Sequence, residues 1–235
     1  MTHEEWPRRV AALGQFRVSD VARPSLDPAS DHHLRTVLRA RVDEEVVVTD
    51  GAGAWALCRV AASSLDAVSD VRHDRPGPET TLYLSPLKGD RAQWAVAKAT
   101  EVGITRIVPL ASARTVVALR GDARAKTVVR WRRVALEAAA QCRRTYDVTI
   151  DEPVAPSAVP ENVAVADMNG DGNWSGVRAV AVGPEGGWTF EEWAPSRRRL
   201  ALGPTVLRAE TAGVVAAALM AFHAGDWGFT FDGAK

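Results

Sequence analysis

Short apolar runs separated by turns dominate the first third of the chain. The runs that are typical of β-strands are residues 15–18, 45–49 and 55–61. The glycine-containing turn at residues 51–53 joins the last two runs as a hairpin. Between the first two, residues 30–39 place Leu34, Val37 and Leu38 at helical spacing after a Ser-Asp start. This part is predicted to be a small β-barrel with one short helix.

Beyond residue 80 the pattern changes to apolar runs that alternate with amphipathic helices. Two prolines, a glycine and several charges at residues 74–79 separate the two patterns, as expected of a linker. The predicted strands are residues 81–85, 106–110, 163–166, 179–182 and 200–202, and the predicted helices are 91–102, 127–142, 190–198 and 211–223. This alternation predicts an α/β fold with a mostly parallel sheet. We therefore expect two domains, residues 1–75 and 76–235.

Composition and charge leave the function open. The chain has 235 residues, and its 29 basic and 29 acidic side chains give a net charge of zero, so composition offers no argument for nucleic-acid binding. Arginines nevertheless cluster, and such clusters are either phosphate-contacting stripes or solvated helix faces. One line along the predicted helix at 127–142 carries Arg130, Arg133, Glu137, Gln141 and Arg144. It has the same two interpretations.

Several common sites are disfavoured by spacing. Residues 167–172 (DMNGDG) imitate the start of a calcium loop, but Arg178 stands where the closing glutamate is required, which favours a polar turn. No metal site is expected. The longest apolar run near the C-terminus, residues 214–222, spans about half of the roughly 20 residues that cross a bilayer. No signal peptide is recognisable, so we expect a cytoplasmic protein without a membrane partner.

Two loops share an unusual form. Residues 181–187 (AVGPEGG) and 201–211 (ALGPTVLRAET) each leave an apolar strand through Gly-Pro. Glycine lets a ligand approach the backbone closely, and proline makes the turn rigid. Neither loop has the lysine of a P-loop or the glycine spacing of a dinucleotide fold. If they follow neighbouring parallel strands, they form a ligand slot at the carboxyl edge of the sheet. Ordinary strand-to-helix turns remain the alternative.

Five stretches in order cover most of the chain: HHLRTVLR (32–39), KGDRAQWAVAKATEVGITRIVPL (88–110), RWRRVALEAAAQCRR (130–144), VGPEGGWTFEE (182–192) and LGPTVLRAETA (202–212). Together they resemble the RsmE family, SPOUT-class methyltransferases that modify N3 of a uridine in 16S ribosomal RNA. The resemblance implies an N-terminal PUA-like β-barrel and a C-terminal α/β domain with a trefoil knot. It also implies S-adenosylmethionine as methyl donor, the small ribosomal subunit as substrate and a homodimer.

The same resemblance implies roles for individual residues. Arg208 is expected to stabilise charge on the uracil, and Glu210 or Glu185 either accepts the N3 proton or caps the next helix. The expected cofactor-binding residues are Val182, Gly183, Pro184, Glu185, Gly186, Gly187, Leu202, Gly203, Val206 and Leu207. The expected RNA-binding residues are Arg35, Arg39, Lys88, Arg91, Gln141 and Arg144. The alternatives are another SPOUT enzyme, acting on tRNA or on a ribose 2′-hydroxyl, and a non-catalytic RNA-binding module in ribosome assembly.

Overall fold

The computed structural model describes residues 5–115, 119 and 121–225. The chain divides into two compact units, each described here by itself. The first unit combines residues 1–76 with 136–147, and the second combines 77–135 with 148–235. The sequence prediction had placed residues 136–147 in the second domain. They group with the first unit because their polar groups bond to residues near its start and to Asp74.

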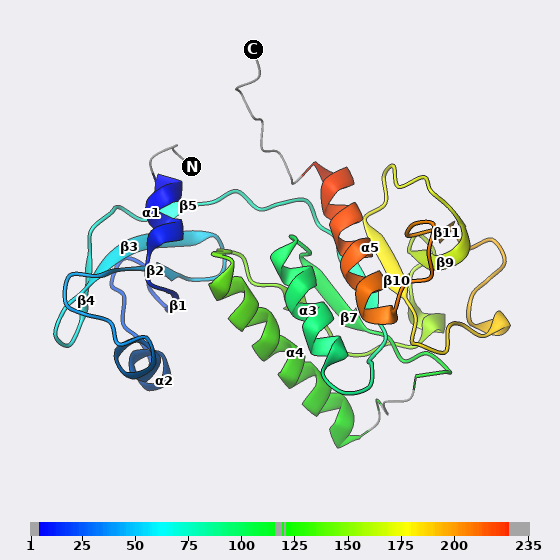
Figure 1. Ribbon diagram of the computed structural model, residues 1–235, viewed down its shortest axis with the longest axis horizontal. Coiled ribbons are helices and arrows are strands. Elements are labelled where there is room, and N and C mark those ends of the chain that lie inside the picture. Colours follow the sequence, from blue (N-terminus) through cyan, green and yellow to red (C-terminus); the bar gives the residue numbers. More distant parts are fainter. Residues whose placement is uncertain (1–4, 116–118, 120, 226–235) are drawn as a thin grey trace, which may run out of the picture. The chain divides into compact units, whose positions relative to one another are not determined.

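A five-stranded sheet forms the centre of the first unit (Figure 1). Its strands are β1 (Gln15–Arg17), β2 (Glu45–Thr49), β3 (Ala54–Val60), β4 (Leu65–Ala67) and β5 (Arg72–His73). The order is β1-β2-β3-β4, with β5 also paired to β3, and only the β1–β2 pair is parallel. The three predicted strands are confirmed within one residue at their ends. The pattern missed β4 and β5, because two or three residues are too few to show a period.

A short helix, α2 (Pro28–His32), continues directly into a π-helical turn at His33–Val37. The predicted start at Ser30 is two residues late, because the cap is Asp27, whose carboxylate accepts the N–H groups of Ala29 and Ser30. Leu34 is fully buried in the apolar core of this unit, as its spacing predicted. A helix at the start of the chain, α1 (Glu5–Ala11), was not predicted.

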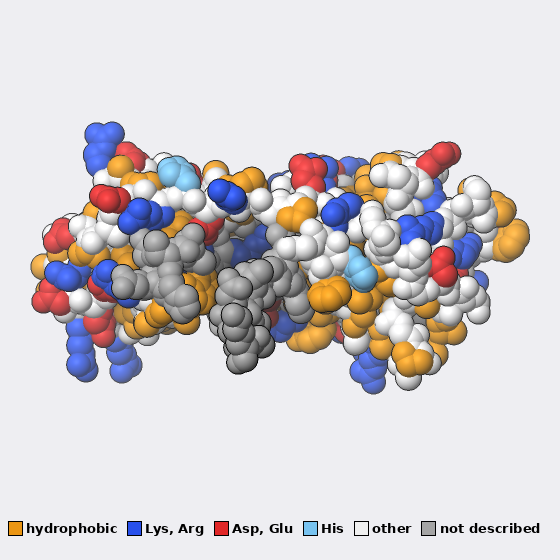
Figure 2. Space-filling view, turned by 90° about the horizontal axis from the view of Figure 1, so that it is seen from above, with side chains coloured by type: hydrophobic (Ala, Val, Ile, Leu, Met, Phe, Trp, Pro, Cys, Tyr) orange, Lys and Arg blue, Asp and Glu red, His pale blue; other side chains and the backbone are white. Residues whose placement is uncertain are grey.

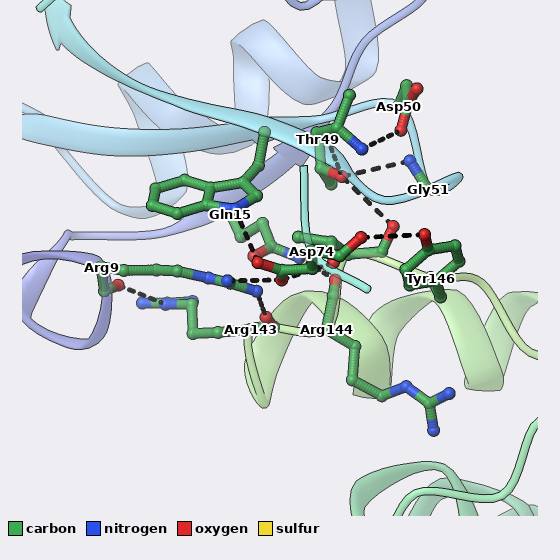
Figure 3. A network of polar contacts seen from close by, with 12 residues as sticks. Arg9, Gln15, Thr49, Asp50, Gly51, Asp74, Arg143, Arg144 and Tyr146 are labelled. Atoms are coloured by element: carbon green, nitrogen blue, oxygen red, sulfur yellow. Dashed lines mark hydrogen bonds and ion pairs between the residues drawn. The ribbon is translucent and has the colours of Figure 1, made fainter. Parts of the chain in front are cut away.

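A buried polar network joins α1 to the segment at residues 143–147 (Figure 3). The side chain of Arg9 is only 2% exposed, and its Nη1 donates to Oδ2 of Asp74 at 2.8 Å. The guanidinium also donates to the carbonyl of Arg143 and lies 4.8 Å from the centre of the Trp55 ring. Asp74 accepts two further bonds, from Nε1 of Trp55 at 2.9 Å and from Oγ1 of Thr145 at 2.7 Å. The buried charge of Arg9 is therefore matched by a carboxylate that is itself fully hydrogen-bonded.

The second unit contains a six-stranded sheet in which every neighbouring pair is parallel. Its strands are β6 (Thr81–Leu84), β7 (Arg106–Pro109), β8 (Thr149–Ile150), β9 (Ala164–Asp171), β10 (Ala179–Val182) and β11 (Arg199–Leu200), in the order β11-β9-β10-β6-β7-β8. The predicted parallel sheet is confirmed. Apolar residues cover both faces: Val180 and Val182 belong to one core cluster, and Ala181 between them belongs to another.

Three long helices contribute to the larger core of this unit: α3 (Arg91–Glu101), α4 (Asp122–Gln141) through its residues up to 135, and α5 (Ala209–Ala224). The predicted helix at residues 190–198 is wrong, since only a single 3₁₀ turn forms at Phe190–Glu192. Pro195 explains the difference, because the residue before a proline is disfavoured in helical conformation. A second 3₁₀ turn forms at Pro156–Ala158. In the described part of the chain no helix is long and apolar enough to cross a bilayer.

Strand β9 runs through Asp171, so the polar turn expected at residues 167–172 is wrong. The strand continues because β11 pairs with it, with a register shift between Arg199 and Leu200. The two backbones approach closely at Gly170, where a Cβ atom would stand 2.4 Å from the nitrogen of Leu200. Only glycine fits there. The polar residues therefore concealed a strand whose partner, β11, lies 29 to 34 residues later in the sequence at the paired positions Leu200–Asp171 and Arg199–Val165.

Candidate functional site

A cavity of about 900 Å³ opens in the second unit where β10 ends and α5 begins. Three segments wall it: residues 166–169 of β9, the Gly-rich loop at 182–190 and the loop at 202–209 that leads into α5. The two Gly-Pro loops thus meet at one site, as expected. The strands that precede them are not neighbours, however, because β9 lies between β10 and β11 and contributes the third wall.

Nine of the ten residues predicted to bind a cofactor line this cavity: Val182, Gly183, Pro184, Glu185, Gly187, Leu202, Gly203, Val206 and Leu207. Gly186 is not among the lining residues. Its carbonyl instead accepts a 2.8 Å hydrogen bond from Nη1 of Arg114, so it serves as an anchor for the loop. The Gly-rich loop closes on itself through a 2.9 Å bond from the N–H of Gly187 to the carbonyl of Pro184. Gly187 has φ +67°, a conformation that favours glycine.

Trp188 fixes the Gly-rich loop to β9. Its indole Nε1 donates to the carbonyl of Ala166 at 3.1 Å, and its ring packs against Gly183. A Cβ atom at Gly183 would lie 3.0 Å from that ring. A larger residue at position 183 would therefore force the tryptophan ring to shift, in addition to any effect on the approach of a ligand.

Glu192 holds the far end of the same loop. Its carboxylate accepts the N–H of Ala113 at 2.6 Å and the N–H of Thr189 at 2.7 Å. Burial alone would raise the pKa of Glu192, but these hydrogen bonds outweigh it and lower the pKa below its usual value. The ionised carboxylate thus ties residues 112–114 to the loop. Together with the bond from Arg114 to Gly186, it gives the loop two fixed points outside the cavity.

Arg208 stands at the rim of the cavity immediately before α5. Its backbone is extended, with φ −64° and ψ 151°, and its carbonyl accepts the N–H of Ala212. The side chain is exposed, and among the described residues its guanidinium has no hydrogen-bond or ion-pair partner. A cation without a partner beside a ligand-sized cavity is available for an anionic or electron-rich group.

The two glutamates predicted as alternative proton acceptors share one cation. Arg91 lies with Nη1 3.3 Å from Oε1 of Glu185 and with Nε 4.0 Å from Oε1 of Glu210. Glu185 and Arg91 line the cavity, whereas Glu210 is not among its lining residues. The side chain of Glu210 is 12% exposed, and its Oε2 is buried without a hydrogen-bond partner within the described structure. A buried carboxylate oxygen without a hydrogen bond lowers the stability of the fold, so its presence in a native structure points to a functional role.

The other predicted RNA-binding residues lie outside the cavity. In the first unit, Arg35 pairs with Asp31 at 2.7 Å and donates to the carbonyl of Ala61, while Arg39 is exposed. In the second unit, Lys88 is exposed before α3. Gln141 and Arg144 group with the first unit; Gln141 is exposed and Arg144 is half-buried. Basic and acidic side chains are interspersed on the face that Figure 2 shows.

Sequence reasoning missed the wall that β9 contributes. Asp167, Met168 and Asn169 line the cavity, and so does Arg199, which pairs with Asp167. Phe190 at the rim is 87% exposed. The available signal for this wall was the cluster of polar residues directly after an apolar strand. Because residues 167–172 resemble an incomplete calcium-binding loop, they were interpreted as a polar turn.

Comparison with known proteins identifies the class. A family model described as an RNA methyltransferase domain matches residues 75–221, and one described as an RNA methyltransferase PUA domain matches residues 31–69. The fold is therefore that of an RNA methyltransferase with an N-terminal PUA domain, which confirms the predicted fold class, while the knot stays a prediction. The chain belongs to the family of ribosomal RNA small subunit methyltransferase E.

Relatives of this name occur in several bacteria. The chain is 31% identical to the enzyme of Synechocystis over 84% of this chain and 72% of that one, and 27% identical to that of Bacillus subtilis over 90% and 94%. The crystal structure of the Neisseria gonorrhoeae enzyme bound to S-adenosyl methionine has a TM-score of 0.72 at 25% identity and covers 89% of this chain and 97% of that one. A putative methyltransferase of Legionella pneumophila shares the fold, with a TM-score of 0.78 at 22% identity over 88% and 96%.

Proposed function

We propose that this protein transfers the methyl group of S-adenosylmethionine to N3 of a uridine in 16S ribosomal RNA of the small subunit. The observation that carries the proposal is the convergence of both Gly-Pro loops on one cavity, with the unpartnered Arg208 at its rim. Membership of the family supports the methyl donor and the substrate. We also propose a cytoplasmic location, which a ribosomal substrate supports, and the homodimer that the family resemblance implies.

The cavity suits the proposed donor in size and chemistry. Its volume of about 900 Å³ lies within the range of cofactor sites. Apolar side chains such as Val182 and Leu207 suit an adenine ring and a methionine chain, and the backbone groups of two glycine-containing loops are available to polar atoms. When bound, S-adenosylmethionine supplies an electron-poor methyl group on a positively charged sulfur.

Arg208 and the two neighbouring glutamates can account for the activation of the uracil. Uracil N3 carries a proton, so the site must remove it and stabilise the charge that develops on O2 or O4. The guanidinium of Arg208 is free to bind that oxygen. Two glutamates are candidate acceptors of the proton: Glu185 lines the cavity but pairs with Arg91 at 3.3 Å, whereas Glu210 is not among the lining residues but its Oε2 has no hydrogen bond.

Two measurements test the proposal in sequence. Calorimetric titration with S-adenosylmethionine should show saturable binding, and its absence would favour a non-catalytic RNA-binding role. Purified small subunits, naked 16S rRNA and tRNA are then each incubated with labelled donor, and the methylated nucleosides are mapped by mass spectrometry. The proposal expects 3-methyluridine at a single position. A ribose 2′-O-methyl group or a label confined to tRNA would refute it.

Replacing Gly203 should weaken cofactor binding without unfolding the protein. Gly203 lines the cavity with φ +144°, and no atom lies within 4 Å of the place where a Cβ would stand. In Gly203→Ala the loop must leave this conformation or accept strain of about 1–3 kcal/mol. We expect roughly tenfold weaker binding of S-adenosylmethionine by calorimetry. Gly172→Ala is the matched control, because Gly172 has open space and no positive φ and lies outside the cavity. Equal affinities for the two variants would contradict the prediction.

A further inference from the structure

A second cavity, of about 380 Å³, lies in the second unit between the segment that leads into α3 and the first half of α4. Its floor is apolar, with Leu87, Ala92 and Trp131 each no more than 3% exposed. The volume falls near the lower end of the range of ligand pockets. It is separate from the cavity described above, because no residue lines both.

Two cations stand on the α4 side of this second cavity. Lys126 and Arg130 are exposed, and their four-residue spacing places them on the same face of the helix. Neither has a hydrogen-bond or ion-pair partner among the residues that the structure describes. Other cations of α4 are engaged: Arg124 pairs with Glu152 at 3.1 Å, and Arg132 donates to the carbonyl of Ile150 at 3.0 Å. The unpartnered cations of this helix region are therefore the ones that face the cavity.

The opposite side of the cavity is formed by the start of α3. Asp90 precedes the helix, and its carboxylate does not cap the first N–H groups but accepts a 3.3 Å bond from Nε2 of Gln93. The first-turn N–H groups of a helix have no partner within it, and they favour an anion. Asp90 is the one carboxylate among the lining residues, against the two cations. The cavity thus combines an apolar floor with a positively charged edge.

We propose that this cavity binds one nucleotide of the RNA strand outside the methylated position. The phosphate contacts Lys126 and Arg130, and the base or ribose rests on the apolar floor beside Leu87. A phosphorylated ribonucleotide matches both properties, because it joins an anionic group to a flat, largely apolar ring. The inference rests on the proposed function, from which it takes RNA as the source of the nucleotide.

The test measures the affinity for RNA and its dependence on salt. A fluorescein-labelled fragment of 16S rRNA is titrated with wild type, Lys126→Gln, Arg130→Gln and the double variant, at several salt concentrations. Glutamine is a good helix former, and both positions are exposed, so α4 should persist. We expect the double variant to bind roughly tenfold more weakly at moderate salt, and the slope of log affinity against log salt to fall by about 1.4.

Arg178→Gln is the matched control. Arg178 is exposed, lies in the same unit outside the cavity, and has no side-chain partner among the described residues. An equal loss in Arg178→Gln and in the double variant would overturn the proposal. Melting temperatures and calorimetric binding of S-adenosylmethionine, both expected to be unchanged, separate a lost contact from a lost fold. If the melting temperature of the double variant is lowered, the proposal is tested with the two single variants instead. Each is expected to reduce the slope of log affinity against log salt by about 0.7.

A second arm distinguishes RNA from a free nucleotide. Uridine 5′-monophosphate is titrated against the same proteins. Saturable binding that disappears in the double variant, while RNA affinity is unchanged, would make the ligand a free nucleotide and overturn the assignment to RNA. The readout is independent of methyl transfer. RNA affinity that depends on Lys126 and Arg130 in a protein without methyltransferase activity would therefore refute the proposed function and leave this inference intact.

Discussion

Arg208→Ala is expected to lose methyl incorporation into small subunits by about 10²–10³-fold. Removing a hydrogen-bond donor that reaches a negative charge developing in the transition state costs a factor of this size. The guanidinium has no partner in the described structure, so its removal leaves no orphaned group and the fold should persist. The measurement is the initial rate of transfer from labelled S-adenosylmethionine, with binding of the donor followed separately by calorimetry.

Arg178→Ala provides the comparison for Arg208→Ala, because it removes an exposed arginine from the same unit at a position outside the cavity. It should retain the rate of the wild type. If Arg208→Ala retained it as well, Arg208 would have no part in the reaction. A loss of RNA affinity with an unchanged maximal rate would make Arg208 a binding residue instead of a group that acts on the transition state.

Asp74→Ala is expected to destabilise the first unit by about 3–5 kcal/mol. The substitution leaves the guanidinium of Arg9 buried without a counter-charge and removes the acceptor of Trp55 and Thr145. The free energy of unfolding is measured by urea titration. Asp20→Ala is the control, since Asp20 forms a similar pair with Arg23 on the surface, where such pairs contribute little. Similar values for the two variants would show that the buried network is not a major source of stability.

The same network predicts how stability depends on pH. Burial would raise the pKa of Asp74, but the hydrogen bonds from Arg9 and Thr145 outweigh it and hold the pKa below its usual value. The ionised form is therefore favoured by folding. Its contribution is fully present above the pKa of an unfolded aspartate, about 3.9, and is lost as the pH falls through the lower pKa of the folded state. Asp74→Ala should show a smaller loss of stability across that acidic range than the wild type does.

The sequence pattern predicted the elements whose residues are buried in a regular period. Strand β10 and helix α5 were found because Val180, Val182 and Ala216 follow that period. The two Gly-Pro loops were recognised by residue type, and they do meet at one cavity. The wall formed by Asp167, Met168 and Asn169 was not, because the pairing of β9 with β11 joins segments far apart in the sequence and leaves no local signal.

Long-range polar contacts were equally inaccessible to pattern analysis. Nothing local to Arg9 indicates that it is buried, and its carbonyl partner is 134 residues away. The predicted helix at residues 190–198 failed for a different reason. The capping box of Thr189 and Glu192 does begin a helical turn, but Pro195 prevents it from continuing into a helix.

The first unit is discontinuous in the chain, and this affects how it is made. Its sheet ends near residue 73, but the carbonyls that satisfy Arg9 and Gln15 belong to Arg143 and Arg144. During synthesis the N-terminal unit cannot complete its polar interior until residue 147 has left the ribosome, by which time β6 and β7 of the other unit have also emerged. An N-terminal fragment cut after Pro76 would keep Asp74 as the counter-charge of Arg9, but it would lack the carbonyls of Arg143 and Arg144 that accept hydrogen bonds from Arg9 and Gln15.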